Sequence, residues 1–502
     1  MFRGIFRWSP SMAAAIFLAV ATGAQGQEEG IASGYAPADQ ASVVQAGSNP
    51  QTIAFGQPGA GDAEQTAFLA PPAPDDPANA DLAKRVADLE RRLAEYSAAG
   101  SANPGASGKP LIAPTGRIQF DAASFNQNPA SYQQFGNVHN AVGFRRARLA
   151  LLGEYQLIDY IIEMDFANRG ADAVINSKAQ STAFKDVYIQ MRELPVLGNL
   201  RVGHFKECFG LDQLNSDNYT TFMERSLCDE GAFVPGRNNG IMAFNWAESQ
   251  RATWAIGAFT NQTGFDQPPT FQYDHGGYDV TMRATYLPWY DEPSGGRGYL
   301  HTGVDFAYRT APDHLGIFAI RPESAFAPSV VNLKFTDADH WEVYGAETAV
   351  TYGSLSLQSE VFAANVDRQN GLTNNFYGTY AYVSYFLTGE NRPYNRKMGV
   401  FDRVRPYENF FRVRTGDGDV ATGRGAWEIA YRFSYIDMLD GLKTTGAGRA
   451  ADHTVGVNWY LNPYTRVMCN YVHSIDTYNV SATSRVSDGS LDTLMMRFAI
   501  DF

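Results

Sequence analysis

From residue 115 onward, the chain repeats segments in which apolar and polar positions alternate. The last segment, 489–502, is the clearest. Apolar side chains occupy every second position from Leu494 to Phe502, and the positions between them are mixed, with charges at Arg497 and Asp501. Alternation with period two is typical of a β-strand, and an apolar face opposite a polar face predicts a strand between two solvents.

Sixteen such segments can be counted, separated by turn-rich stretches. They lie near residues 115–126, 142–154, 158–169, 183–193, 198–207, 239–247, 252–261, 277–288, 297–310, 340–352, 354–364, 375–388, 424–436, 452–461, 464–475 and 489–502. A single-chain bacterial barrel requires an even number of strands, and sixteen strands enclose an aqueous lumen. A last strand ending on an aromatic, Phe502, resembles the closing strand of a bacterial outer-membrane barrel. The predicted fold is all-β: a 16-stranded antiparallel transmembrane β-barrel over 115–502, with a short N-terminal coiled-coil helix.

The first residues predict export. Arg3 and Arg7 precede an apolar run at 12–23, and small residues at 24 and 26 suit cleavage before residue 27. We expect residues 1–26 to be a cleaved signal peptide. After it, no stretch of about 18 apolar residues occurs. A membrane protein of this composition would therefore be a closed barrel, because a closed sheet satisfies its own backbone in lipid.

Two linkers and one heptad pattern precede the barrel. Residues 27–80 are rich in Ala, Pro, Gly, Gln and Asp without periodicity, which predicts a disordered linker, and 98–114 continue it. Within 81–97, apolar residues follow heptad spacing at Leu82, Val86, Leu89, Leu93 and Tyr96. This spacing predicts a coiled-coil helix of about two heptads. Because two heptads are marginal alone, a lone amphipathic helix or no stable helix remains the alternative.

The net charge limits the kinds of partner, and two of the cysteines raise the question of a disulfide. The formal net charge is −13, and removal of Arg3 and Arg7 with the signal peptide would leave −15. This balance argues against nucleic acid as a partner, but in a pore the local charge at a constriction outweighs the total. Cys208 and Cys228 lie in one loop and could form a disulfide in an oxidising compartment. The alternative is that both are reduced and buried.

Connections of the predicted barrel alternate in length, with short turns on the side expected to be periplasmic. Long connections lie at 208–238, 262–276 and 311–339. The connection 389–423 breaks this rule, since it has 35 residues on the short side. A loop of that length in a compact domain is usually functional, so we expect it to fold into the lumen.

No catalytic constellation is present in the sequence. The eight histidines are scattered, and neither an HExxH motif nor a GxSxG nucleophile elbow occurs. We therefore expect no enzyme activity, no cofactor and no metal site.

Several segments, in order along 115–502, resemble the phosphate-selective porin O and P family. They are FRRARL at 144–149, GHFKECFGLD at 203–212, FMERS at 222–226, AFVPGRNNG at 232–240, YFLTGENRPYN at 385–395, GVFDRVRP at 399–406, GAWEIAYRFS at 425–434 and VGVNWYLNPYTRVMCNY at 455–471. The resemblance implies a trimeric, 16-stranded outer-membrane porin whose lumen arginines and lysines guide anions.

The resemblance also implies which cations line the pore. Arg117 and the Arg145–Arg146 pair match pore-lining positions, Lys206 starts the third external loop, and 389–423 matches a connection that bends inward. Alternation independently points Arg283, Arg309, Arg432, Arg466 and Arg497 inward. The anion path that we expect comprises Arg117, Arg145, Arg146, Lys206, Arg283, Arg392, Arg396, Lys397, Arg403, Arg405 and Arg432. Arginine suits this role because its charge is permanent and its planar fork fits phosphate oxygens.

Acidic residues on the same face leave a second interpretation open. The acids expected to face the lumen are Glu163, Asp165, Asp186, Asp305, Glu428 and Asp501, and the third loop adds Glu207, Asp212, Glu224, Asp229 and Glu230. The strand arginines could pair with them and brace the barrel instead of binding solutes. Arg145 and Arg146 would point to opposite faces of an ideal strand, so either one lies at the rim or a bulge turns it.

The sequence favours passive diffusion of small inorganic anions, with phosphate as the candidate, across a bacterial outer membrane. The expected partners are outer-membrane lipid and two further copies of the chain in a homotrimer. A general porin, or one that prefers carboxylates or polyphosphate, is the alternative on the same scaffold. A secreted soluble all-β enzyme or binding protein, with the coiled coil as oligomeriser, is the alternative of another class.

Overall fold

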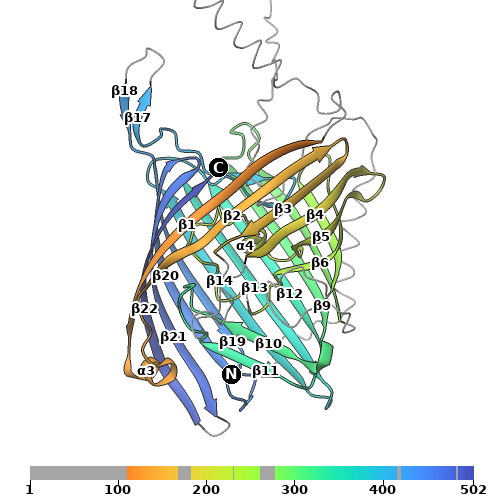
Figure 1. The fold of residues 1–502 in the computed structure, drawn as a ribbon, viewed down its shortest axis with the longest axis vertical. Coiled ribbons are helices and arrows are strands. Elements are labelled where there is room, and N and C mark those ends of the chain that lie inside the picture. Colours follow the sequence, from red (N-terminus) through yellow and green to blue (C-terminus); the bar gives the residue numbers. More distant parts are fainter. Residues whose placement is uncertain (1–109, 168–181, 230, 261–276, 415–419, 482–483) are drawn as a thin grey trace, which may run out of the picture. The chain divides into compact units, whose positions relative to one another are not determined.

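Sixteen antiparallel strands form a closed barrel in the computed structural model, which describes residues 110–167, 182–229, 231–260, 277–414, 420–481 and 484–502 (Figure 1). They are β1 (Leu111–Gln127), β2 (Ala141–Tyr155), β3 (Ile158–Asp165), β4 (Ala183–Leu194), β5 (Gly198–Lys206), β6 (Arg237–Trp246), β7 (Ala252–Thr260), β8 (Tyr278–Tyr290), β9 (Gly298–Thr310), β12 (Ala338–Tyr352), β13 (Leu355–Arg368), β14 (Thr373–Phe386), β19 (Ala426–Asp437), β20 (Gly448–Asn462), β21 (Thr465–Ser481) and β22 (Ser484–Asp501). Strand β1 pairs with β22, with Arg117 opposite Asp501, which closes the sheet. The predicted 16-stranded barrel is confirmed.

The barrel belongs to a compact unit that includes 112–153 and 157–502. Residues 111 and 154–156 group with a second unit, of which the described part is only these few residues and residue 110. The predicted signal peptide, the linkers up to residue 109 and the coiled-coil helix lie outside the described residues, as does the whole of the predicted loop 262–276. Among the described residues, no helix is long and apolar enough to cross a membrane.

The alternation of the strands puts apolar side chains outside. On β22, Leu494, Met496 and Phe498 are about half exposed, whereas Met495 and Arg497 between them are buried inside the barrel. A soluble protein would bury its apolar face and leave the charged one in water. The opposite arrangement suits a barrel whose outer surface faces lipid, so the soluble alternative is wrong.

The third loop, 207–236, runs inside the barrel. Its short helix α4 (Leu211–Leu214) lies in the interior (Figure 1). Glu360 of β13 anchors the start of this helix, because its carboxylate accepts hydrogen bonds from the backbone N–H groups of Leu211 at 2.6 Å and Asp212 at 3.0 Å. The loop therefore narrows the lumen.

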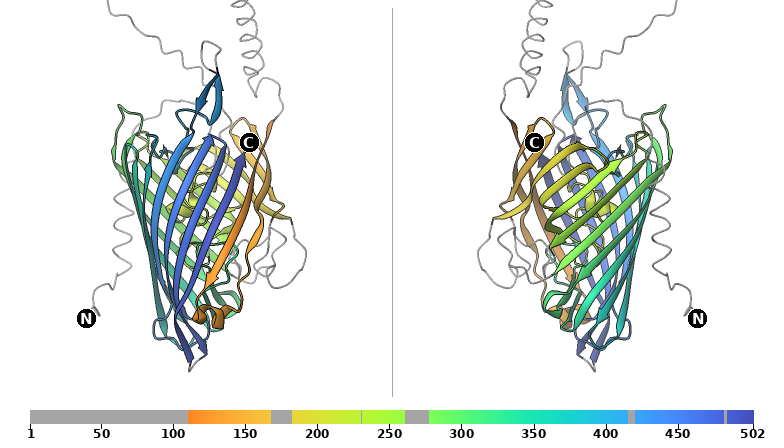
Figure 2. Two further views of the ribbon diagram at one scale, coloured as in Figure 1. Left: turned by 90° about the vertical axis from the view of Figure 1, so that its left-hand side faces the viewer. Right: turned by 90° about the vertical axis from the view of Figure 1, so that its right-hand side faces the viewer.

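The first part of the connection 389–423 also enters the lumen, as predicted. Two short strands, β15 (Tyr394–Asn395) and β16 (Val400–Phe401), form a hairpin there. The Phe401 N–H donates to Asn215 of the third loop at 2.9 Å, so the two inserted segments meet. The second part instead forms a hairpin of β17 (Phe411–Arg414) and β18 (Val420–Gly423) that projects from the barrel end nearest the C-terminus (Figure 2).

An apolar cluster fills one side of the interior. It joins Phe209 and Phe233 of the third loop to Phe318 and Leu333 of the hairpin β10 (Gly316–Ile320) and β11 (Val331–Phe335). The wall residues of this cluster belong to β9, β12, β13, β14, β19 and β20. A second, smaller apolar cluster lies against β2–β7 and includes Ile161, Met242 and Phe244.

A short helix, α3 (Pro129–Phe135), lies in the connection between β1 and β2. The Asn128 side chain accepts from the Ser131 N–H at 2.8 Å and caps the helix, and Pro129 occupies its first turn. Asn followed by Pro is a helix-start signal that the strand-based prediction did not use.

Candidate anion path in the lumen

Four arginines surround one carboxylate of the third loop. Arg146 and Arg225 lie 2.9 Å from Asp217 oxygens, Arg148 lies at 3.4 Å, and Arg117 lies at 3.7 Å. All four side chains and the carboxylate are buried. Because one negative charge faces four positive ones, this cluster fastens the loop to the wall and is locally cationic even though Glu163 and Asp165 also contact it.

Arg145 and Arg146 both reach the third loop. Arg145 donates to both oxygens of Glu224 at 2.9 Å, while Arg146 contacts Asp217. The exposed apolar residues of β2 are Val142, Phe144, Leu149 and Leu151. The outward-facing positions are even-numbered before the two arginines and odd-numbered after them, so the alternation shifts by one residue there. This shift is the irregularity required for two adjacent side chains to face the same interior.

Two carboxylates of the third loop, Asp217 and Glu224, stay charged in these surroundings. Burial alone would raise the pKa of Asp217, but Arg146, Arg225 and Arg148 outweigh burial and hold this pKa well below its usual range. Burial acts in the same way on Glu224, and Arg145 and Arg497 hold its pKa below the ordinary value. The two acids therefore act as permanent anchors for the loop at neutral pH.

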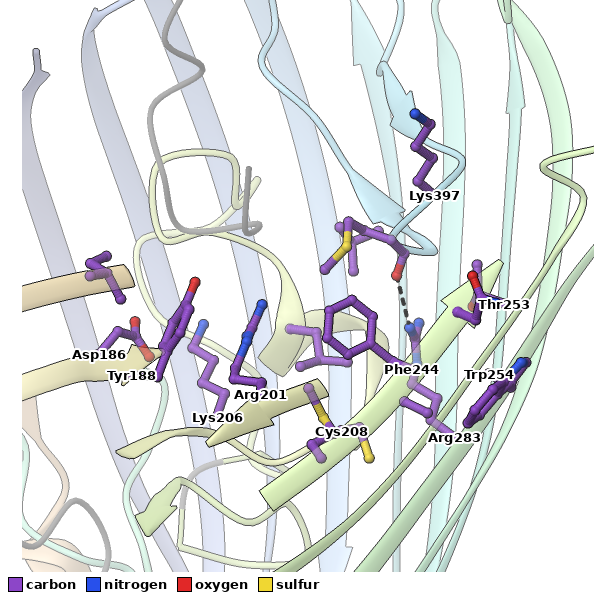
Figure 3. Close-up of a pocket in the computed structure, with 17 residues that line it drawn as sticks. Asp186, Tyr188, Arg201, Lys206, Cys208, Phe244, Thr253, Trp254, Arg283 and Lys397 are labelled. Atoms are coloured by element: carbon purple, nitrogen blue, oxygen red, sulfur yellow. Dashed lines mark hydrogen bonds between the residues drawn. The ribbon is translucent and has the colours of Figure 1, made fainter. Parts of the chain in front are cut away.

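A cavity of about 80 Å³ lies between strands β3–β8, the start of the third loop and the tip of the 389–423 connection (Figure 3). Its cations are Arg201, Lys206, Arg283 and Lys397. Asp186 is the one carboxylate among the 17 described residues that line it. Arg237 binds this carboxylate through two hydrogen bonds, at 3.0 and 3.2 Å, so the lining of the cavity is electropositive.

Arg201 is the most distinctive cation of the cavity, and the sequence analysis missed it. Its Nε and Nη2 atoms both donate to Oε1 of Gln190, at 3.1 and 2.7 Å, and its guanidinium carbon lies 4.1 Å from the centre of the Tyr188 ring. Among the described residues, no carboxylate forms an ion pair with it, and no hydrogen bond uses its Nη1 atom. Inward alternation from Asn199 to Arg201 was the signal that could have found it.

Two lysines lie at the cavity from opposite segments. The Lys206 Nζ atom donates to the carbonyl oxygens of Gln213 at 2.8 Å and Asn215 at 3.3 Å, both in the third loop. Lys397, at the tip of the other inserted connection, lies with Nζ 5.3 Å from the Trp246 ring centre. The structure therefore brings together the predicted residues Lys206, Arg283 and Lys397.

Arg283 holds the inserted tip. It contacts Glu347 at 2.8 Å and donates to the carbonyl oxygen of Gly399 at 2.7 Å. Gly399 has φ +66°, and a Cβ atom there would lie 2.8 Å from the Thr285 hydroxyl. Only glycine fits this left-handed, close approach without strain.

The remaining predicted cations mostly brace the barrel. Arg432 pairs with Glu323, and Arg403 pairs with Asp501. The others with partners are Arg117 on Glu163 and Asp217, Arg392 on the Tyr219 carbonyl and Thr221, and Arg396 on Glu292 and two carbonyls of 249–250. These residues thus fit the interpretation that lumen cations bond within the protein and brace the barrel. A smaller set of the predicted cations is left to contact solutes.

Arg405 lies outside this arrangement. Its side chain is exposed, and the structure records no hydrogen bond or ion pair for it within the described part of the chain. It does not line the cavity.

Cys208 and Cys228 are both buried free thiols in the structure, which is the second of the two alternatives that the sequence left open. The Cys208 thiol lies 3.3 Å from the carbonyl oxygen of Thr281 on β8, whereas the Cys228 thiol lies 3.5 Å from that of Tyr435 on β19. The two ends of the third loop thus meet different walls of the barrel. Loop spacing in the sequence does not reveal this separation.

Three buried carboxylates form the group that most resembles a cation site. Oxygen atoms of Asp305, Glu347 and Glu360 lie within 4.8 Å of one another. Asp305 accepts from the Gly210 N–H at 3.1 Å, Glu360 accepts from the next two N–H groups, and Glu347 binds Arg283. These bonds explain the group as an anchor for the loop.

The comparisons with known proteins agree on one family. A model of the family described as phosphate-selective porin O and P matches residues 112–502. Porin O of Pseudomonas aeruginosa is 26% identical over 389 residues, which cover 71% of this chain and 81% of that protein. An uncharacterized protein of Caulobacter vibrioides is also 26% identical, over 340 residues that cover 65% of this chain and 61% of that protein.

Solved structures with similar folds are more distant. The anion-selective porin from Comamonas acidovorans has 11% identity and a TM-score of 0.45, with 78% of this chain and 100% of that chain covered. A loop L8 deletion mutant of OmpT, an outer membrane protein of Vibrio cholerae, has 10% identity and a TM-score of 0.46, with 78% and 99% covered.

Proposed function

The chain belongs to the phosphate-selective porin O and P family of bacterial outer-membrane channels, and on this premise we propose that small anions, phosphate among them, diffuse passively through its lumen. Members of a porin family are channels rather than enzymes. The observation that carries the proposal is the cavity beside β3–β8, with four cations and one carboxylate that Arg237 already binds. A solute in this cavity meets more cationic than anionic side chains.

The cations of the lumen have two kinds of partner, carboxylates and neutral groups, and this difference supports passage of anions rather than tight binding. Arg146, Arg403 and Arg432 are held by carboxylates and shape the lumen. Arg201 is held by a neutral amide, so its positive charge acts on a passing anion with little cancellation. A few such sites in a narrow, low-dielectric passage attract an anion and still release it.

A general porin, or one that prefers carboxylates or polyphosphate, is the second candidate function. Buried acids of the lumen favour it, since Asp305, Glu347 and Glu360 lie close to the Arg283 end of the cavity. A strong phosphate preference would need these acids to lie outside the path. The two candidate functions predict different rankings of phosphate, carboxylates and polyphosphate by how strongly each blocks chloride current.

Phosphate block of chloride current tests the proposal. Purified full-length protein in a planar bilayer should carry chloride current that added phosphate reduces in a concentration-dependent way. Arg201→Gln should weaken this block, and Arg405→Gln, which changes an exposed arginine outside the cavity, should leave it unchanged. A chloride current that phosphate does not reduce would exclude phosphate as a bound solute.

We also propose the assembly that the family resemblance implies. Three barrels would form a homotrimer in outer-membrane lipid, and residues 81–97 would form a parallel coiled coil in the periplasm, with 1–26 removed on export. The heptad spacing of five apolar residues supports the coiled coil.

A further inference from the structure

The cavity has an apolar wall as well as a cationic one. Apolar side chains that line it are Ile161, Leu214, Met242, Phe244, Met398 and Val400. They alternate in space with the cations: Arg201 on β5 pairs in register with Met242 on β6, and its guanidinium carbon lies 5.3 Å from the Phe244 ring centre. Figure 3 shows Arg201, Lys206, Tyr188 and Phe244 side by side along this wall.

Inorganic phosphate can use only the cationic part of this lining. A phosphate ion presents oxygen atoms on every side, and each oxygen needs a hydrogen-bond donor or water. Oxygens turned towards Met242 and Phe244 would lose water and gain no donor. An anion whose charge is confined to one end avoids this loss, and its other end gains from contact with the apolar side chains.

We propose that this cavity binds organic anions in which a single carboxylate or phosphate group is attached to an aromatic or short aliphatic body. The charged head contacts Nη1 of Arg201, and the body packs on Met242 and Phe244. This inference rests on the proposed passage of anions and specifies the solute class at the same site. The cavity of about 80 Å³ limits the buried part of the solute to the size of a small ring or a short chain.

A series of blockers with one charge and a growing apolar body tests this inference. Acetate, butyrate and benzoate are added in turn to the full-length channel in a planar bilayer, and block of chloride current is measured for each. Benzoate should block about tenfold more tightly than acetate, because partial burial of a ring adds that much affinity. Inorganic phosphate serves as the reference for an anion without an apolar body.

Substitutions in the apolar wall test whether this wall causes the stronger block by benzoate. Phe244→Ala should remove most of the advantage of benzoate over acetate. Met242→Gln, which keeps the side-chain length, is the second variant and should reduce the same advantage even if Phe244→Ala does not fold. The matched control is Met495→Ala, since Met495 on β22 is buried in a different apolar cluster, and benzoate should keep its advantage in this variant.

The outcomes separate this inference from the proposed function. Equal block by acetate and benzoate in the wild-type channel would overturn the inference, as would a benzoate advantage that survives both variants. The anion preference on which the proposed function depends is measured separately, by the zero-current potential in a KCl gradient. A channel that prefers chloride over potassium but shows no benzoate advantage would therefore keep the proposed function and lose the organic-anion site.

Discussion

Arg201 and Gln190 lie opposite each other on β5 and β4, and two nitrogen atoms of the guanidinium donate to the same amide oxygen, at 3.1 and 2.7 Å. The amide fixes the side chain without cancelling its charge. Arg146 differs, because it forms an ion pair with Asp217 in addition to its hydrogen bond to the Gln119 amide. A lumen crowded with ion pairs can therefore remain electropositive at the few places where an arginine has a neutral partner.

Replacing Arg201 tests whether this charge sets selectivity. Arg201→Gln should lower the ratio of chloride to potassium permeability by about fivefold, since one charge in a narrow passage is worth on the order of 1 kcal/mol. The measurement is the zero-current potential in a KCl gradient. Arg405→Gln removes an equal charge outside the cavity and should change nothing; an equal shift in both variants would mean that total charge matters rather than position.

Asp217 should matter more for stability than for conduction. Asp217→Asn leaves four buried arginines around a neutral amide, which should destabilise the folded barrel by about 3 kcal/mol. The temperature at which the folded band converts to the unfolded band in SDS gels should fall. Glu292→Gln changes an exposed carboxylate of a turn and is the control. An unchanged conversion temperature in Asp217→Asn would show that the loop does not depend on this cluster.

The same acids predict a pH dependence. The pKa values of Asp217 and Glu224 are lowered in the folded protein, so on acidification the unfolded chain takes up protons first. Their stabilising contribution is thus fully present above about pH 4 and is lost as the pH falls through the folded-state pKa values. Other buried carboxylates titrate as well, among them Asp229, whose pKa burial raises, so the two anchors are isolated by comparison with Asp217→Asn. The difference in conversion temperature between the wild-type protein and Asp217→Asn should be constant between about pH 7 and 5 and shrink below about pH 4. A difference that grows on acidification would contradict this account of the anchors.

Assembly can be tested by truncation. Removal of residues 27–110, with the signal peptide retained, should leave trimers in detergent, because a coiled coil of about two heptads contributes little alone. Light scattering after size-exclusion chromatography measures the mass of the assembly. Monomers after truncation would show that the coiled coil is the main contact between subunits.

Alternation predicted all sixteen wall strands because every wall strand separates lipid from lumen. Their ends were harder to place. Strand β13 was expected to end near residue 364 but continues to Arg368. Beyond the apolar band, outward positions need not be apolar, so the pattern fades before the strand ends. The hairpins β10–β11, β15–β16 and β17–β18 were missed because their strands are short and do not face lipid.

The site was predictable only in part. Lys206, Arg283 and Lys397 were expected and do line the cavity. Arg201 was overlooked because Gly203, with φ +143° and no room for a Cβ beside Val187, interrupts the alternation of β5. The partners of the arginines could not be read from the sequence either, since Arg145 and Glu224 are 79 residues apart and meet only when the third loop folds inward.

The zero-current potential of the wild-type channel tests the central claim most directly. Full-length protein is inserted into a planar bilayer of neutral lipid that separates two KCl solutions differing about tenfold in concentration. If the cations of the cavity outweigh the net charge of −13, the sign of the potential will show chloride to be more permeant than potassium. A potential of the opposite sign would show that the lumen carboxylates dominate and would contradict the account.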